Sequence, residues 1–194
     1  GVLDDADVTT APSASTSDLT VSSISNGSFT VTGSVPAGQS VTVTYTVTVK
    51  PDGQRGDNTI ANFIVPTGTT PPSECAADDA ACTTNTAPEL VVTKTVDPAD
   101  GTAVKAGDKL TYTITFANTK GTAPAAVDSV DSLAGILDDA DVTTAPSAST
   151  SDLTVSSISN GSFTVTGSVP AGGTVTVTYT VTVKPDGQRG DNTI

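Results

Sequence analysis

The sequence predicts an all-β protein made of immunoglobulin-like antiparallel β-sandwich repeats in tandem. Two observations support this prediction. Apolar and polar residues alternate strictly in several segments, as in strands with one buried face. Residues 1–60 also recur as residues 135–194 with 57 of 60 positions identical, and a fixed period of this kind indicates repeated structural units.

The clearest strand covers residues 41–49, VTVTYTVTV, and its copy covers residues 175–183. Valine and tyrosine occupy one face and threonine the other, a pattern typical of an antiparallel strand with one face in the core. Residues 110–116 and 29–35 alternate similarly, and Gly, Pro and Asn mark turns between these runs. Strands of this length and spacing predict a sandwich of about seven strands per repeat.

The repeat sets the expected domain boundaries. Residues 1–65 are interpreted as the C-terminal part of one repeat without its first strands, and residues 89–194 as the next repeat without its last strand. That last strand is represented in the first copy by residues 61–65. Residues 66–88 are rich in Thr, Pro, Ala and Asp and show no alternation, so they are predicted to be a linker.

Cys75 and Cys82 lie in this predicted linker and are the two cysteines of the chain. An even pair in a chain of secreted character favours a disulfide that closes a small loop. A zinc site would need further ligands, and the sequence has neither His nor another Cys to supply them.

Charge and composition narrow the possible functions. The formal net charge is −13, which opposes binding to nucleic acid and to anionic membranes, and there is no run of 18 apolar residues. Without His, and without a Gly-rich phosphate loop, no catalytic constellation is evident, so we expect a protein that is not an enzyme and has no cofactor. The expected partners are neighbouring identical repeats in the same or adjacent chains.

Lys94 is unusual because it shares the apolar face of its predicted strand with Leu90, Val92 and Val96. Asn62 and Asp131 also lie in register with apolar residues. A desolvated lysine can lose its proton and attack an Asn carboxamide, while a nearby carboxyl group relays protons. Lys94, Asp131 and Asn62 are therefore candidates for an isopeptide bond, and the alternative is a lysine at the sandwich rim with its ammonium in water.

Four segments carry a family resemblance: LVVTKTVDPADGTAVKAGDKLTYTITFANT, VDSVDSLAGILDDADV, GSVPAGGTVTVTYTVTV and DNTIANFIV. They resemble the immunoglobulin-like surface repeats of bacterial, especially actinobacterial, proteins known as the domain-of-unknown-function-eleven superfamily. Lys94, Asp131 and Asn62 also resemble the reactive residues of isopeptide-forming pilin domains, although VDSL lacks the proline often found after that leucine. The 134-residue period assigns Lys94 and Asn62 to different repeats, so neither has its partner within its own domain here.

Two further motifs are each open to two interpretations, a binding site or an ordinary polar turn. Asp138, Asp139 and Asp141, repeated from Asp4, Asp5 and Asp7, are weak candidates for calcium ligands, and the alternative is a solvated acidic loop. Arg55-Gly56-Asp57 and its copy at residues 189–191 spell the integrin-binding tripeptide, which a turn also explains.

These observations favour a structural stalk or fibre repeat of a secreted or cell-surface bacterial protein, covalently stabilised and located outside the cell or in its wall. Near-identity between copies suits a spacer, because binding modules usually diversify their loops. The alternatives are an adhesin domain for a host or matrix ligand, with calcium as a possible cofactor, and a subunit of an extracellular sheath.

Overall fold

The computed structural model describes residues 1–76 and 78–194. The chain divides into two compact units, unit 1 from Gly1 to Ala87 and unit 2 from Pro88 to Ile194, and each is described by itself. Nearly all regular structure is β, and every strand pair is antiparallel. No helix in the described part of the chain has the length and apolar character needed to cross a membrane.

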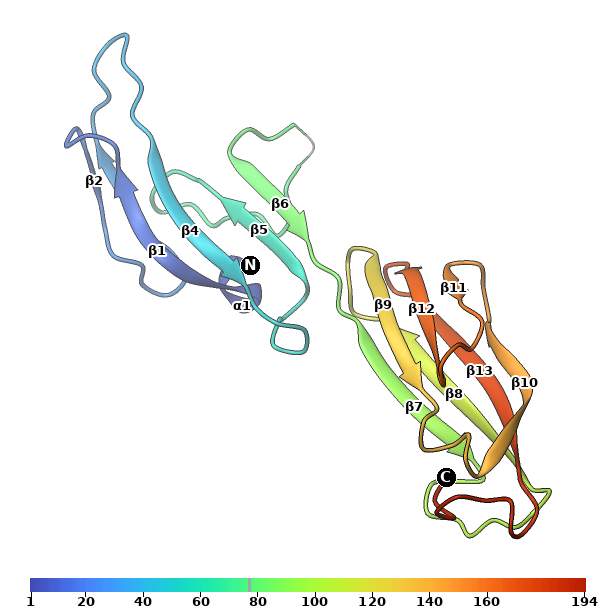
Figure 1. The fold of residues 1–194 in the computed structure, drawn as a ribbon. Coiled ribbons are helices and arrows are strands. Elements are labelled where there is room, and N and C mark those ends of the chain that lie inside the picture. Colours follow the sequence, from blue (N-terminus) through green and yellow to red (C-terminus); the bar gives the residue numbers. More distant parts are fainter. Residues whose placement is uncertain (77) are drawn as a thin grey trace. The chain divides into compact units, whose positions relative to one another are not determined.

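Unit 2 consists of seven strands in two sheets (Figure 1). The four-stranded sheet has the order β10-β13-β8-β7, and the three-stranded sheet has the order β11-β12-β9. The strands are β7 (Val91–Asp97), β8 (Lys109–Ala117), β9 (Ala125–Ser132), β10 (Ala140–Ala148), β11 (Leu153–Val155), β12 (Ser162–Val169) and β13 (Thr174–Val183).

The core of unit 2 lies between these two sheets. Alternate residues of β8 and β13 point inward from one sheet, and residues of β9, β11 and β12 point inward from the other. Tyr179 of β13 stacks on Tyr112 of β8 and meets the edge of Phe163 of β12. This face-to-face arrangement confirms the predicted antiparallel β-sandwich, and the period-2 alternation is its direct cause.

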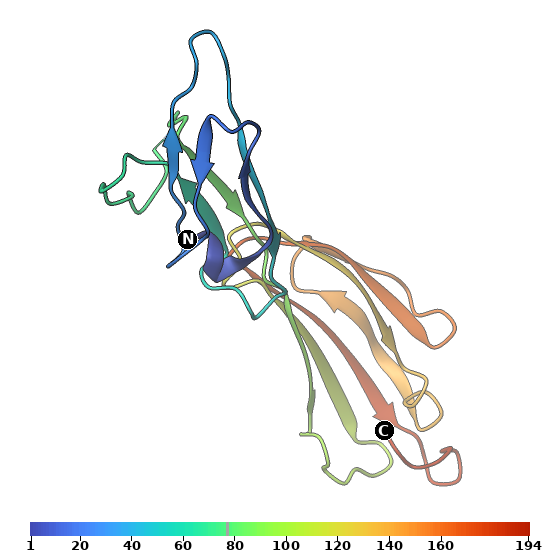
Figure 2. The same ribbon diagram turned by 90° about the vertical axis from the view of Figure 1, so that its left-hand side faces the viewer.

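Outside residue 77, unit 1 contains one short helix and six strands, which form three two-stranded sheets: β1-β4, β2-β3 and β5-β6. The elements are α1 (Val2–Asp5), β1 (Ala6–Ala14), β2 (Leu19–Val21), β3 (Val31–Gly33), β4 (Val43–Val49), β5 (Thr59–Phe63) and β6 (Cys82–Thr86). The segment between β3 and β4 projects from the unit in both views (Figures 1 and 2). In unit 2 the two ends of its copy, residues 168–169 and 174–176, belong to β12 and β13 and pair with β9 and β8.

Identical residues are buried differently in the two units. Val35 is 50% exposed and Val49 is 46% exposed in unit 1, whereas their copies Val169 and Val183 are 0% and 2% exposed. In unit 2 the β13 strand pairs with β8 and β12 pairs with β9, and the described residues of unit 1 include no counterpart of β7, β8 or β9. Unit 1 therefore contains copies of strand pairs from both sheets, β1-β4 for β10-β13 and β2-β3 for β11-β12, and its apolar residues are more exposed than those of unit 2.

The segment predicted to be a linker, residues 66–88, contains a strand. Residues 82–86 form β6, which pairs with β5 from Thr59↔Thr86 to Phe63↔Cys82, and unit 1 extends to Ala87. The sequence CTTNT has no apolar alternation, because β6 is exposed along nearly all of its length. Main-chain pairing with β5 forms this strand, and pairing of this kind leaves little pattern in the side chains.

The disulfide predicted between Cys75 and Cys82 is present, with the two Cα atoms 5.7 Å apart. Cys82 is the first residue of β6 and lies opposite Phe63 of β5. The bond therefore ties the loop before β6 to the β5-β6 hairpin, and it belongs to unit 1.

Candidate cross-link and carboxylate sites

Lys94 lies in the edge strand β7 of unit 2, opposite Ile114 of β8. Its ammonium nitrogen Nζ donates hydrogen bonds to both carboxylate oxygens of Asp131, over distances of 2.7 and 3.0 Å. Asp131 belongs to β9 in the opposite sheet, so this ion pair bridges the sandwich near its edge. The Lys94 side chain is 38% exposed and that of Asp131 is 11% exposed.

Two tyrosine rings complete the surroundings of Lys94. The Nζ atom lies 5.1 Å from the ring centroid of Tyr112 and 5.6 Å from that of Tyr179. These distances suit cation–π attraction. Burial raises the pKa of the Tyr179 hydroxyl, and the negative charge of Asp131 raises it further. The sequence pattern placed Lys94 with apolar residues but gave no sign of these ring contacts, which depend on how the strands pair.

Asn62 lies in β5 of unit 1, opposite Thr83 of β6. Its side chain is exposed, as is that of Ile64, which is 67% exposed on the same face of the segment. The structure thus brings Lys94 and Asp131 together, while Asn62 belongs to the other unit.

A second group of polar residues forms where β10 begins and the chain turns after β13. Asp138, Asp139 and Asp191 each offer a carboxylate oxygen, and these oxygens lie within 4.8 Å of one another. We call them the acidic cluster of unit 2. Asp139 Oδ1 accepts a hydrogen bond from the Asn192 amide at 3.0 Å, and Asp191 Oδ1 accepts one from the Thr193 amide at 2.9 Å.

The acidic cluster of unit 1 repeats this arrangement with Asp4, Asp5 and Asp57. The Asn58 amide donates to Asp5 Oδ1 at 2.9 Å. Burial raises the pKa of the Asp5 carboxyl. The hydrogen bond from the Asn58 amide lowers this pKa, but its effect is smaller than that of burial. The neighbouring carboxylates Asp4 and Asp57 raise it further. Here the amino group of Gly1 lies 2.8 Å from Asp4 Oδ1.

The ligand set expected from the sequence differs from the set that the fold assembles. Asp138 and Asp139 are in the cluster, but Asp141 is the second residue of β10, and its Oδ1 is 3.9 Å from the Nζ atom of Lys184. Asp191 was missed because it is 52 residues away in the sequence from Asp139. One sequence feature could have linked the two: the Asp-rich motif and the Arg-Gly-Asp turn both occur in each copy of the repeat.

All three residues of the Arg-Gly-Asp tripeptide of unit 1 make close contacts within that unit. The Arg55 side chain is 5% exposed, and its guanidinium donates to Asn58 Oδ1, to the Lys50 carbonyl and to Asp52. A Cβ atom at Gly56 would lie 2.8 Å from Asp4 Oδ2. Asp57 belongs to the acidic cluster. The turn therefore holds carboxylates together and leaves little of the arginine for a receptor.

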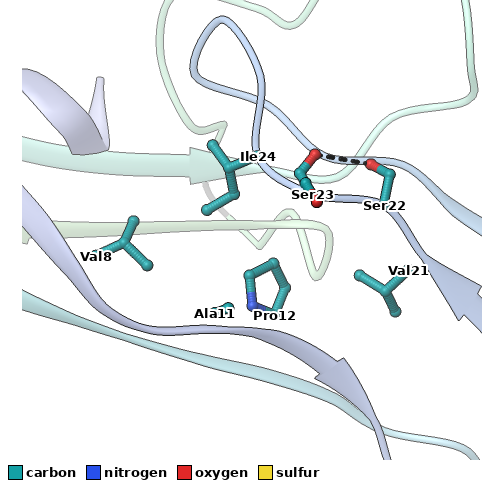
Figure 3. A pocket seen from close by; sticks show the side chains of 7 residues that line it. All are labelled: Val8, Ala11, Pro12, Val21, Ser22, Ser23 and Ile24. Carbon is teal, nitrogen blue, oxygen red and sulfur yellow. Dashed lines mark hydrogen bonds between the residues drawn. The ribbon is translucent and has the colours of Figure 1, made fainter.

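A shallow apolar depression lies beside β1 in unit 1 (Figure 3). Its lining residues are Val8, Ala11, Pro12, Val21, Ser22, Ser23 and Ile24. Ser22 Oγ donates to the Ser23 carbonyl and accepts from the Thr30 amide, so its hydroxyl is already engaged. The register of β1 against β4 shifts around this point, and Pro12, which has no amide hydrogen, lies in the shifted part. The depression accompanies an irregular strand, and its lining presents no chemically reactive group.

Fold and sites together define an all-β protein of antiparallel sandwich units, with an inter-sheet ion pair and a repeated acidic cluster. A family model described as "Domain of unknown function (DUF7927)" matches residues 1–87 and again residues 89–194. The chain belongs to this family. No curated protein and no solved structure matches the chain.

Proposed function

We propose that this chain is a stretch of a structural stalk or fibre in a secreted or cell-surface bacterial protein. In this proposal the sandwich units are spacers that provide length and stability, and their partners are neighbouring copies of the same repeat. The immunoglobulin-like and pilin-domain resemblance of the sequence points in the same direction.

The observation that carries the proposal is the identity of the two copies at both buried and exposed positions. Among the 60 repeated positions, the differences are Val2/Ile136, Gln39/Gly173 and Ser40/Thr174. A core can be kept similar by packing alone, but exposed threonines and loops usually diverge when they bind different ligands. Copies with the same surface suit a repeated spacer.

Covalent stabilisation is the second part of the proposal. Lys94 and Asp131 are already in contact, and the rings of Tyr112 and Tyr179 shield one side of the ammonium group. Once a strand equivalent to β5 lies beside them, its Asn would bring a carboxamide carbon to Nζ. Asp131 would take the proton from Nζ and return it to the leaving nitrogen, so that ammonia departs and an amide bond forms.

This step is testable with a chain extended beyond Ile194 by a second copy of residues 61–87. With the disulfides reduced, the expected result is an intact mass about 17 Da below that of the unmodified sequence, because ammonia is lost. Tandem mass spectrometry should then find Lys94 joined to the Asn that corresponds to Asn62.

Two controls isolate the reaction. The extended chain with Lys94→Arg, and the chain without the extension, are expected to show their full masses. With Asp131→Asn in the extended chain, we expect the cross-link to form far more slowly. A full mass for the extended chain itself, in a folded sample, would contradict the cross-link.

The adhesin alternative gains no support from the Arg55 geometry. Recognition of the arginine by a receptor would require access to its guanidinium, whereas the Arg55 side chain is almost fully buried in unit 1. A binding assay with immobilised integrin and the whole chain checks this point, and we expect no binding above that of an Arg55→Ala, Arg189→Ala variant.

A further inference from the structure

We propose that each acidic cluster is a calcium-binding site, formed by Asp138, Asp139 and Asp191 in unit 2 and by Asp4, Asp5 and Asp57 in unit 1. The proposal does not depend on the stalk function, since it concerns local chemistry in each unit. It assigns to the Arg-Gly-Asp turn a role in metal binding.

The spacing of the carboxylates suits a single ion. Calcium holds oxygen ligands at about 2.3–2.6 Å, so two oxygens on the same ion lie at most about 5 Å apart. The ligand oxygens of Asp138, Asp139 and Asp191 all fall within 4.8 Å of one another. Three carboxylates can therefore reach one ion without a change of fold.

An independent observation points to a missing ligand. Asp139 and Asp5 are both 0% exposed. One oxygen of each, Oδ1, accepts a main-chain amide, but the buried Oδ2 atoms have no hydrogen-bond partner among the described residues. A buried carboxylate oxygen without a partner costs free energy, and a cation in the cluster would remove that cost.

Charge strengthens this argument in unit 2. Lys184 Nζ donates to the carbonyls of Leu137 and Asp138, and Arg189 pairs with Asp186. Among the described residues, no lysine or arginine forms an ion pair with Asp138, Asp139 or Asp191. Ionised carboxylates this close repel one another unless a cation or a proton lies between them.

The ligand chemistry selects the kind of cation. All three side chains offer hard oxygen atoms, and the sequence has no His. Oxygen ligands suit calcium and magnesium, while zinc and copper favour nitrogen and sulfur. Calcium tolerates irregular geometry, and magnesium demands a near-ideal octahedron. The ligands of this site come from a turn before β10 and a loop after β13. We expect irregular geometry from such a site, and this favours calcium.

Gly56 and Gly190 provide the space that the site needs. A Cβ atom at either position would collide with a carboxylate oxygen, Asp4 Oδ2 in unit 1 or Asp138 Oδ2 in unit 2. The glycine lets one loop approach the other closely, and the aspartate that follows it supplies a ligand.

The test is isothermal titration of the whole chain with calcium chloride, with the thermal unfolding midpoint measured beside it. We expect a dissociation constant of about 10⁻⁴ to 10⁻³ M and an unfolding midpoint raised by about 2–5 °C at saturation. The decisive variant carries Asp57→Asn and Asp191→Asn, and we expect its dissociation constant to rise at least tenfold. The matched control carries Asp7→Asn and Asp141→Asn, which changes the net charge equally but should bind as the original chain does.

Three outcomes would overturn the proposal: no calcium binding by the original chain, equal loss of binding in both variants, or an equal rise in the midpoint with magnesium or sodium at matched ionic strength. Circular dichroism in chelator checks that the Asp57→Asn, Asp191→Asn variant is folded. Should it be unfolded, the Asp4→Asn, Asp138→Asn variant replaces it, and calcium affinity equal to that of the original chain in this second variant also overturns the proposal.

Discussion

At the residue scale, Asn118 shows how one side chain can hold several loops. The sequence indicates a turn at residues 118–121, but in the structure Asn118 is 0% exposed. Its Oδ1 accepts from the Glu89 amide, and the two N–H groups of its Nδ2 are shared among three carbonyl oxygens, those of Ala123, Val169 and Pro170. Gly121 is required beside it, because a Cβ atom there would overlap the Asn118 amide. Asn118 therefore ties together four segments of unit 2.

Replacing this residue should be costly. Asn118→Ala is expected to lower the free energy of unfolding of unit 2 by about 3 kcal/mol, since it leaves a buried amide and several carbonyls without partners. Urea denaturation followed by tyrosine fluorescence and circular dichroism measures the change. The neighbouring exposed residue provides the control, and Thr119→Ala should change stability by less than about 0.5 kcal/mol. Similar values for the two variants would mean that Asn118 is an ordinary turn residue.

At the element scale, β4 has the same sequence as the last seven residues of β13, in a different environment. Val181 in β13 is 0% exposed and lies opposite Leu110 of β8, while its copy Val47 in β4 is half-buried. Their local propensities are equal, so any difference in stability comes from tertiary packing.

This pair allows a test without a change of local sequence. Val181→Ala should destabilise unit 2 by about 2 kcal/mol, because it removes buried methyl groups and leaves a cavity. Val47→Ala should cost unit 1 well under about 1 kcal/mol, because that side chain still contacts water. Hydrogen exchange read by mass spectrometry, on peptides that include residues 39–40 or 173–174 where the two copies differ, reports the two units separately. Equal losses of protection would show that the β4 face is covered in solution.

At the scale of the whole molecule, the disulfide is expected to stabilise unit 1 and to have no effect on unit 2. Cys75–Cys82 lies entirely within unit 1 and closes a short loop next to the β5-β6 hairpin. A loop of this length contributes about 2–3 kcal/mol in the chain-entropy model. Reduction should therefore lower the unfolding midpoint of unit 1 and leave that of unit 2 unchanged.

Differential scanning calorimetry with and without reductant checks this expectation. A Cys75→Ser, Cys82→Ser chain should behave like the reduced protein. A fall in the midpoint of unit 2 of the same size would show that the two units unfold together and would contradict their independence.

Much of the fold was predictable because burial in a sheet leaves a period-2 pattern. The alternation in residues 41–49, 110–116 and 175–183 identified strands that the structure contains, and the cysteine pair identified the disulfide. Strand β6 was not predicted, because its exposed side chains carry no pattern. Lys94 and Asp131 were selected by their register among apolar residues, and their direct contact depends on the packing of one sheet against the other.

By itself, the sequence determined that this chain is all-β, that it repeats with a period of 134 residues and that its cysteines form a pair. These properties follow from local residue patterns, from a comparison of the sequence with itself and from a count of cysteines, so they need no coordinates. Tertiary structure decided which copy of a strand is buried, which Asp joins each acidic cluster and where Arg55 points. Those properties depend on residues far apart in the chain, such as Asp139 and Asp191, which only strand pairing and loop closure bring together.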